Sequence, residues 1–183
     1  YEIHIILTDG KDKEPYYKLY PSITLHQLDI NYDEMYGRSL WKRISGYWNK
    51  QQLFMKRLND CLCEIRPDIT ISLLRRDINF INKMKDGSIK LGEIHFNKSN
   101  YREFSDNRLP AFVQHCVKKY WMWQLIRQVR QLKRFVVLSY EDAAEWTKLK
   151  NVAVIYNPLP FFPERQSDGS SKQVIAAGRY MPQ

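Results

Sequence analysis

Glu93 and His95 stand at the end of the apolar run SIKLGEIHF, residues 88–96. Side chains two positions apart on a strand share one face of the sheet, so Glu93 is placed to orient the His95 imidazole. A histidine at the C-terminal end of a strand lies where open α/β sheets build their sites, and its imidazole is able to donate a hydrogen bond to a phosphate or hydroxyl group. A surface histidine bonded within a loop fits the same pattern and is the more common outcome.

Other polar residues also follow predicted strands. Gly178 and Arg179 come after the apolar run that ends at Ala177, at a turn of the kind that usually carries catalytic or binding residues after such strands. Arg75 and Arg76 follow the run 68–74 and are placed to meet an acceptor or a phosphate, although a solvated loop of mixed charge is the commoner result. Asn97, in the loop after the run 88–96, is a further candidate to contact an acceptor or to orient the site.

A basic helix is predicted over residues 110–134, which begins at a proline and contains no acidic residue. Its apolar face, with residues such as Val117, Tyr120 and Val129, is expected to bury against the sheet. Aromatic and cationic side chains on its other faces suit contact with an anionic membrane surface, and the simpler alternative is a packing helix with a solvated basic face. The residues predicted for this membrane contact are Lys118, Lys119, Trp121, Trp123, Arg127 and Arg130.

The composition excludes some classes of protein. The 183 residues carry a formal net charge of +9, which favours an anionic partner such as nucleic acid, a membrane surface or a phosphorylated substrate. No apolar run is long enough for a transmembrane helix. The three cysteines have no zinc-like spacing and predict buried, reduced thiols, so we expect no metal. No glycine-rich phosphate-binding motif is present either.

Strands alternate with helices along the chain. Strands are predicted at residues 1–8, 23–30, 68–74, 88–96, 134–139 and 151–157, and helices at 39–65, 79–85, 110–134 and 140–150. Ser139 is placed to cap the last of these helices. This alternation predicts an α/β fold with a Rossmann-like, mostly parallel sheet and helices on both faces. Its apolar strands are expected to be buried on both faces.

Five segments in order resemble the GT-B glycosyltransferases of family 4. They are CEIRPDITISLL, GEIHFN, RFVVLSYEDAAEWTK, NVAVIYNPLPF and KQVIAAGRYMPQ. The resemblance implies an N-terminal, acceptor-side domain at residues 1–157, an interdomain linker at 158–172 and the first strand of a donor domain at 173–183. It also implies a strand and a glycine-rich turn ahead of residues 1–8. Without that strand the sheet lacks a central member, and we expect an exposed apolar edge and self-association.

The resemblance also assigns roles. It implies that His95 faces the donor sugar and diphosphate, and that Gly178 and Arg179 hold the donor diphosphate. The implied activity of the full-length enzyme is retaining transfer of a sugar from a nucleotide-sugar donor, a co-substrate used without metal or cofactor. The implied acceptor is a glycan or a lipid-linked acceptor of cell-surface polysaccharide or lipopolysaccharide synthesis, handled in the cytoplasm or at the inner face of the membrane. The chain of 183 residues is expected to be inactive alone.

Two alternatives to this function stay open. The first is a nucleic-acid-binding module, which the charge of +9 favours but which needs stacking aromatics on a sheet or a reading helix. Because no such sheet is expected here, we expect no nucleic-acid partner. The second is a nucleotide-sugar epimerase of GT-B shape, and the donor domain would distinguish it from a transferase.

Overall fold

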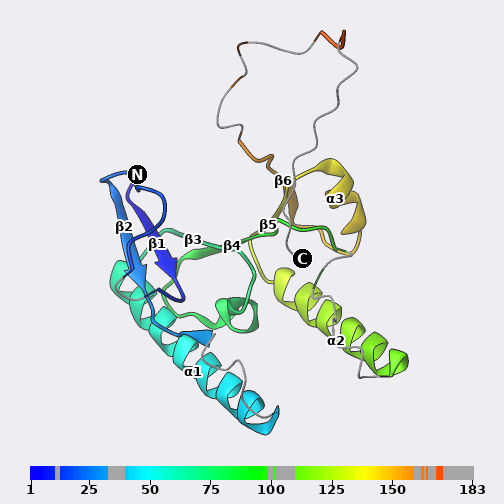
Figure 1. The fold of residues 1–183 in the computed structure, drawn as a ribbon, viewed down its shortest axis with the longest axis horizontal. Helices are drawn as coiled ribbons and strands as arrows, with labels where there is room; N and C mark the ends of the chain where they lie inside the picture. Colours follow the sequence, from blue (N-terminus) through cyan, green and yellow to red (C-terminus); the bar gives the residue numbers. More distant parts are fainter. Residues whose placement is uncertain are drawn as a thin grey trace.

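The computed structural model describes residues 1–10, 13–32, 40–98, 101, 110–158, 162, 164 and 168–170, with the backbone alone at 40–44. Strands and helices alternate along it, as the sequence predicts (Figure 1). The strands are β1 (Ile3–Leu7), β2 (Ile23–Gln27), β3 (Ile69–Ser72), β4 (Ile89–Glu93), β5 (Arg134–Val137) and β6 (Val152–Val154). The helices are α1 (Leu40–Ile65), α2 (Ala111–Val129) and α3 (Tyr140–Glu145), with 3-10 turns η2 (Asp77–Asn79) and η3 (Ile81–Lys83).

Helix ends differ from the predictions for local reasons. The helix predicted at 79–85 is instead a pair of 3-10 turns, closed by bonds such as Phe80 N to Asp77 O at 2.9 Å. Helix α2 ends five residues early because the amide of Asn151 donates to the carbonyls of Val129 and Leu132, each at 2.9 Å. Those two bonds satisfy carbonyls at the helix end and turn the chain into β5.

The strands form two parallel sheets, which makes the fold α/β and Rossmann-like. One sheet has the order β1-β2 and the other the order β3-β4-β5-β6. Every described pair is parallel and joins strands that are consecutive in the sequence. Figure 1 shows β1 between β2 and β3, so the strand order reverses between the two sheets.

The core fills one face of the four-stranded sheet, the inner face. Phe135 of β5 is fully buried there and packs edge to face on Trp146, which follows α3, with ring centres 4.9 Å apart. A methyl group built on Gly92 of β4 would lie 2.5 Å from Leu132 Cδ1 and 2.9 Å from Leu74 Cδ1. Side chains that follow β3, α2 and α3 therefore pack on the inner face in van der Waals contact.

The opposite, outer face of β3 and β4 is exposed. Ile69, Ile71 and Leu73 alternate along the chain with Thr70, Ser72 and Leu74, of which the last two are buried. Ile69, Ile71 and Leu73 are 52%, 62% and 55% exposed, and Ile89 beside them is 49% exposed. The expectation that the apolar strands are buried on both faces is therefore wrong for β3. These residues lie on a face of the sheet, so the exposed apolar edge expected from the sequence stays a prediction.

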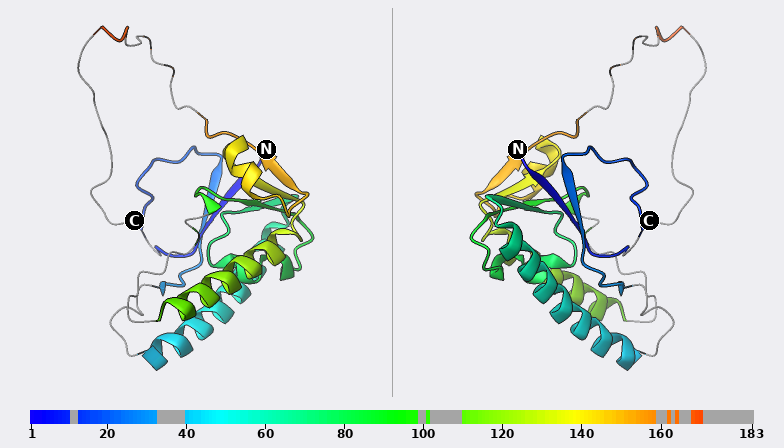
Figure 2. Two further views of the ribbon diagram at one scale, coloured as in Figure 1. Left: turned by 90° about the vertical axis from the view of Figure 1, so that its right-hand side faces the viewer. Right: turned by 90° about the vertical axis from the view of Figure 1, so that its left-hand side faces the viewer.

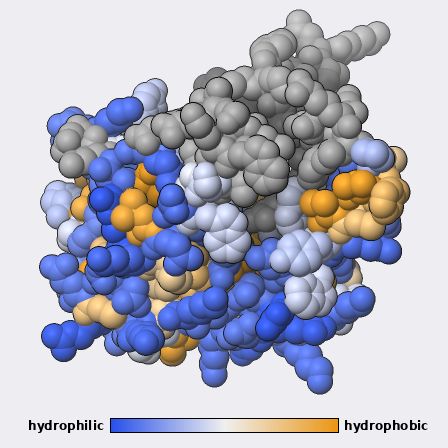
Figure 3. Space-filling view, turned by 90° about the horizontal axis from the view of Figure 1, so that it is seen from below, coloured by the Kyte–Doolittle hydropathy of each residue, from blue (hydrophilic) through white to orange (hydrophobic). Residues whose placement is uncertain are grey.

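Helix α1 joins the two sheets. It lies beside both of them in each view of the ribbon (Figures 1 and 2). Its buried Gln51 donates to the Tyr32 hydroxyl, which follows β2, at 3.0 Å and to the Arg76 carbonyl, which follows β3, at 3.4 Å. Seen from the side where α1 and α2 lie, the described surface is mostly hydrophilic with separate apolar patches (Figure 3). None of the described helices is long and apolar enough to cross a bilayer.

Candidate functional site

The carboxyl ends of strands in both sheets come together. The guanidinium carbon of Arg76, after β3, lies 3.9 Å from the ring centre of Tyr32, after β2. The backbone N–H of Asn31 donates to Asp9 Oδ1, after β1, at 2.6 Å. Because all strands of a sheet are parallel, the turns that follow them form one edge of the molecule, where α/β proteins bind ligands.

Glu93 and His95 form a pair at this edge, as their spacing predicts. His95 Nε2 lies 2.9 Å from Glu93 Oε1, and the two side chains are 45% and 26% exposed. The contact orients the imidazole, with Nε2–H donating to the Glu93 carboxylate. The other ring nitrogen, Nδ1, is then the atom that can meet a ligand. It accepts a hydrogen bond when the imidazole is neutral and donates one when the ring carries a second proton.

The two arginines after β3 are held differently. Arg75 is exposed, and its backbone N–H donates to Asp77 Oδ1 at 3.1 Å. Arg76 packs on Tyr32, and its carbonyl accepts a bond from Asn79 at 3.3 Å. Arg75 is therefore the side chain of the two that faces solvent at the strand ends.

Asp77 shapes this turn. The hydroxyl of Ser72 donates a short hydrogen bond to Asp77 Oδ2 and accepts one from the backbone N–H of Leu74 at 2.9 Å. Burial raises the pKa of the Asp77 carboxyl above its ordinary value, and the bonds from Ser72 and Arg75 act in the opposite direction. Asp77 fixes the turn that presents Arg75.

Asn97 lies in the loop after β4, where contacts with α3 hold the chain. Its amide nitrogen is 3.5 Å from Asp142 Oδ1. The next residue, Lys98, donates a short bond to the Glu145 carbonyl and lies 5.0 Å from the Trp146 ring centre. Asn97 thus stands beside the His95 edge and has a positioning contact of its own.

Helix α2 presents aromatic and basic side chains together. Tyr120 and Trp123 are exposed, with ring centres 6.0 Å apart, and the guanidinium carbon of Arg127 lies 5.4 Å from the Trp123 ring. Lys118 and Lys119 are exposed, and Arg130 donates to the Lys148 carbonyl at 3.4 Å.

The predicted packing of α2 is corrected at two aromatic positions. Trp121 is half-buried and packs against the core, so it does not belong to the exposed group. The prediction that Tyr120 is buried is wrong, since it is 57% exposed. The helix buries Leu125 and Val129 instead, because these are the residues that face the packed end of the sheet.

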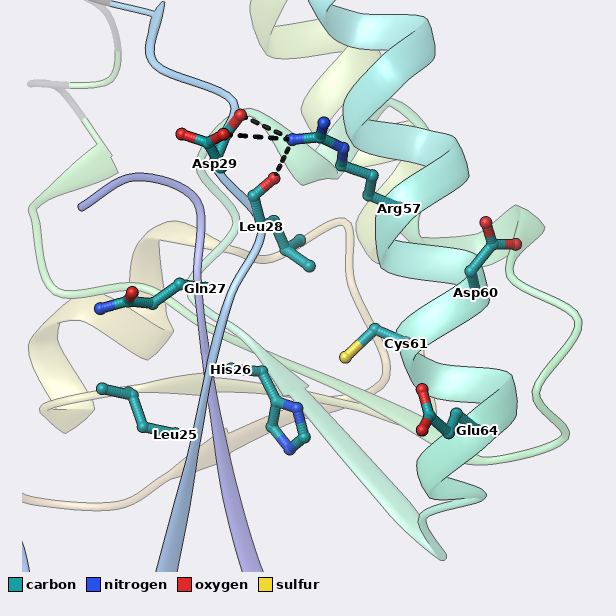
Figure 4. Close-up of a pocket in the computed structure, with 9 residues that line it drawn as sticks. All are labelled: Leu25, His26, Gln27, Leu28, Asp29, Arg57, Asp60, Cys61 and Glu64. Atoms are coloured by element: carbon teal, nitrogen blue, oxygen red, sulfur yellow. Dashed lines mark hydrogen bonds and ion pairs between the residues drawn. The ribbon is translucent and has the colours of Figure 1, made fainter. Parts of the chain in front are cut away.

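A groove between β2 and α1 was missed by the sequence reasoning (Figure 4). It is a shallow groove, largely open to solvent, with a volume of about 660 Å³. Arg57 of α1 lies at one end and donates to the carbonyls of Leu28 and Asp29 at 2.6 and 2.7 Å. His26 points toward Cys61 and Glu64 across it. The pairing of β2 with this part of α1 is a tertiary contact, and no motif in the sequence marks it.

The histidine of the groove is itself paired. His26 Nε2 lies 2.9 Å from Nδ1 of His4 on the neighbouring strand β1, with the rings stacked. Burial and the neighbouring Glu64 raise the pKa of the Cys61 thiol, so it is a weak nucleophile. The described part of the chain holds no group of three or more histidine, cysteine or acidic residues arranged for a metal ion.

The remaining predictions have mixed outcomes. Gly178 and Arg179 lie outside the described residues. The expectation of buried cysteines is wrong for Cys63 and Cys116, which are exposed on helices, and all three thiols are free. Helical spacing placed these two cysteines on outward-facing positions that composition alone does not reveal.

Comparison with known proteins does not assign the chain to a family. No protein-family model matches the chain, and no curated protein sequence matches it. The resemblance to GT-B glycosyltransferases therefore stays a prediction from the sequence segments.

Proposed function

We propose that the chain is the acceptor-side part of a retaining glycosyltransferase, in which a sugar moves from a nucleotide-sugar donor to a glycan or lipid-linked acceptor. The observation that carries the proposal is the Glu93–His95 pair at the carboxyl end of β4, with 2.9 Å between its atoms. It lies in a parallel α/β fold whose strand order reverses between β1 and β3, the arrangement that places ligands at the strand ends.

In this proposal the acceptor-side domain orients the reacting groups and supplies charge. The bond between the sugar and the diphosphate breaks, the oxygen of the acceptor hydroxyl forms the new bond to the sugar, and the hydroxyl proton passes to the departing diphosphate. Glu93 holds the His95 imidazole in place through Nε2. His95 Nδ1 then accepts a hydrogen bond from a sugar hydroxyl, or donates one to the diphosphate when the ring carries a second proton. Gly178 and Arg179 complete the proposal as diphosphate ligands, because a guanidinium binds phosphate oxygens by paired, charge-assisted hydrogen bonds.

The test uses the full-length enzyme with a panel of nucleotide-sugar donors and measures release of the nucleoside diphosphate with and without acceptor. His95→Ala is expected to lower turnover about 10- to 100-fold, the usual size for one positioned donor. His115→Ala is the matched control, because His115 is exposed on α2 and lies outside the His95 pair. Absence of turnover with every donor would refute the transferase, and unchanged turnover in His95→Ala would remove His95 from the site.

We further propose that the enzyme works in the cytoplasm, peripheral on the inner face of the membrane and in contact with anionic lipid through α2. The support is the exposed group of Lys119, Tyr120, Trp123 and Arg127, which combines positive charge with interfacial aromatic rings. Co-sedimentation with anionic vesicles at low salt is expected, and the double variant Lys119→Glu, Arg127→Glu should abolish it. Equal binding to neutral vesicles, or no binding at low salt, would count against this contact.

A nucleic-acid-binding function receives less support. The exposed outer face of β3 and β4 carries aliphatic side chains, Ile69, Ile71, Leu73 and Ile89. Bases stack on aromatic rings, so this face offers them no platform.

A further inference from the structure

An exposed pair of tyrosines stands at the carboxyl ends of β5 and β6. Tyr140 is the first residue of α3, just after β5 ends at Val137, and Tyr156 comes just after β6 ends at Val154. The two residues are 69% and 61% exposed. Their ring centres lie 6.2 Å apart, with the ring planes at 70° to each other. Two aromatic rings from different segments are therefore held together with most of their surface in water.

Packing within the chain does not account for these exposed rings. Neither tyrosine belongs to the core or to the hydrophobic residues packed against it. Another exposed pair, Tyr16 and Tyr17, consists of neighbours in the sequence, so its ring contact needs no tertiary structure. The contact of Tyr140 with Tyr156 does need it, because α3 must lie beside β6 (Figure 1). Aromatic side chains that gather in this way on a surface commonly mark a place where a ligand binds.

Hydrogen-bonding groups lie beside the pair on the same edge of the sheet. Glu141 and Asp142 follow Tyr140 in the first turn of α3, and Glu141 is exposed. Asp142 Oδ1 lies 3.5 Å from the amide nitrogen of Asn97, so the loop after β4 reaches the same place. A carboxylate accepts several hydrogen bonds, and a side-chain amide both accepts and donates. The edge thus offers aromatic faces together with polar groups of both kinds.

The charge beside the tyrosines is negative, although the chain as a whole carries +9. Residues 138–146 contain three acidic and no basic residues, and residues 152–158 contain no charged residue. The Lys98 ammonium contacts the far end of α3, where it donates to the Glu145 carbonyl. A ligand rich in phosphate, such as nucleic acid, would meet repulsion from these carboxylates. The local charge therefore favours a neutral ligand.

A sugar ring matches this combination of groups. The face of a pyranose ring that carries only C–H bonds packs on an aromatic face, which is apolar and slightly negative. The hydroxyl groups around the rim of the sugar donate hydrogen bonds to carboxylates and accept them from amides. Two rings set at a steep angle, with carboxylates beside them, suit a chain of sugars better than a flat apolar molecule.

The strand register places the tyrosines within reach of His95. Glu93 pairs with Val136, and Val136 pairs with Ala153, so His95 and the residue before Tyr156 stand at the same level of the sheet. Strands that are two apart in a sheet are separated by about 10 Å. That separation is comparable with the length of a disaccharide. A glycan that packs on the tyrosines is therefore long enough to extend to His95.

We infer that Tyr140 and Tyr156 bind the sugar rings of a neutral glycan. The hydroxyl groups of the glycan bond to the polar side chains beside the two rings, Glu141, Asp142 and Asn97. The inference deepens the proposed function by naming the sugar rings of the acceptor as the part recognised at this edge. It rests on that function only for the role of the glycan as acceptor, because binding itself needs neither donor nor transfer.

The first test measures binding of neutral hexasaccharides of glucose, N-acetylglucosamine, galactose and mannose to the chain by isothermal titration calorimetry, with no sugar nucleotide present. Saturable binding of at least one of them is expected, and salt should change it little because the ligand is uncharged. Absence of binding to all four would overturn the inference and leave the transferase to its own turnover assay. Tighter binding of a single-stranded oligonucleotide at these two tyrosines would overturn it in favour of nucleic acid.

The second test uses the hexasaccharide that binds best. Tyr140→Ala and Tyr156→Ala are each expected to weaken binding at least about ten-fold, whereas Tyr140→Phe keeps the aromatic face and should retain most of the affinity. Tyr17→Ala is the matched control, because Tyr17 is also an exposed tyrosine in an edge-to-face pair but lies ahead of β2. Unchanged binding in Tyr140→Ala and Tyr156→Ala, or an equal loss in Tyr17→Ala, would refute the inference.

Discussion

Substitution of Gly92 by alanine tests the packing that supports the His95 edge. Gly92 lies one residue before Glu93 on β4, and a methyl group there would be 2.5 Å from Leu132 Cδ1 and 2.9 Å from both Cδ atoms of Leu74. Both leucines are at most 4% exposed, so neither can move aside without disturbing the core. Overpacking of this kind costs about 1–3 kcal/mol. The lower entropy of the unfolded alanine chain offsets about 0.4–1 kcal/mol of this. We expect a net loss of about 1–2 kcal/mol.

Denaturant unfolding followed by circular dichroism measures this loss as a lower midpoint with an unchanged slope. For a chain of this size, each kcal/mol corresponds to about 2–4 °C in melting temperature. The double variant Gly92→Ala, Leu132→Ala serves as the control. Removing the Leu132 methyl groups relieves the contact, so the double variant should lose less than the sum of the single losses. Additive losses, or a Gly92→Ala protein as stable as the original, would refute the packing argument.

Three further substitutions have defined expectations. Phe135→Ala should lower the free energy of unfolding by about 3–5 kcal/mol, because Phe135 is fully buried. Ile71→Ala should lower it by less than about 0.5 kcal/mol, because Ile71 is 62% exposed. Urea midpoints of the two variants measure the difference. Ser139→Ala removes the bond that the Ser139 hydroxyl accepts from the Asp142 backbone N–H at 3.2 Å and should cost about 1 kcal/mol by the same measurement. Burial raises the folded-state pKa of Asp77, so its contribution to stability is present below the ordinary carboxyl pKa of about 4 and is lost as pH rises through the folded value. Asp77→Asn should flatten that part of the stability–pH curve, and an unchanged curve would contradict the argument.

Much of the fold follows from local patterns. The apolar runs at 1–8 and 88–96 contain β1 and β4, as their apolar content and the turn residues beside them predict. Ser139 caps α3 as its position predicts, with its hydroxyl accepting from Asp142 N. The Glu93–His95 contact was also predictable, because it depends on strand periodicity alone.

Features that depend on distant parts of the chain were not predictable. The early end of α2 depends on Asn151, some twenty residues further on. The groove beside Arg57 exists because α1 packs on β2, and its walls share no motif. Ile71 is exposed because the core covers only the opposite face of the sheet, and a run of apolar residues in the sequence does not show which face is covered.

The position of α1 makes it a mechanical link within the molecule. Gln51 and Arg57 bond to groups that follow β2, and the Asn59 side chain accepts a bond from Lys85 N at 3.0 Å, in the chain between η3 and β4. A rotation of one sheet against the other would have to break side-chain bonds along this helix or carry the helix with it. The two sheets therefore move as one body while α1 is intact, and loosening α1 would release them from each other.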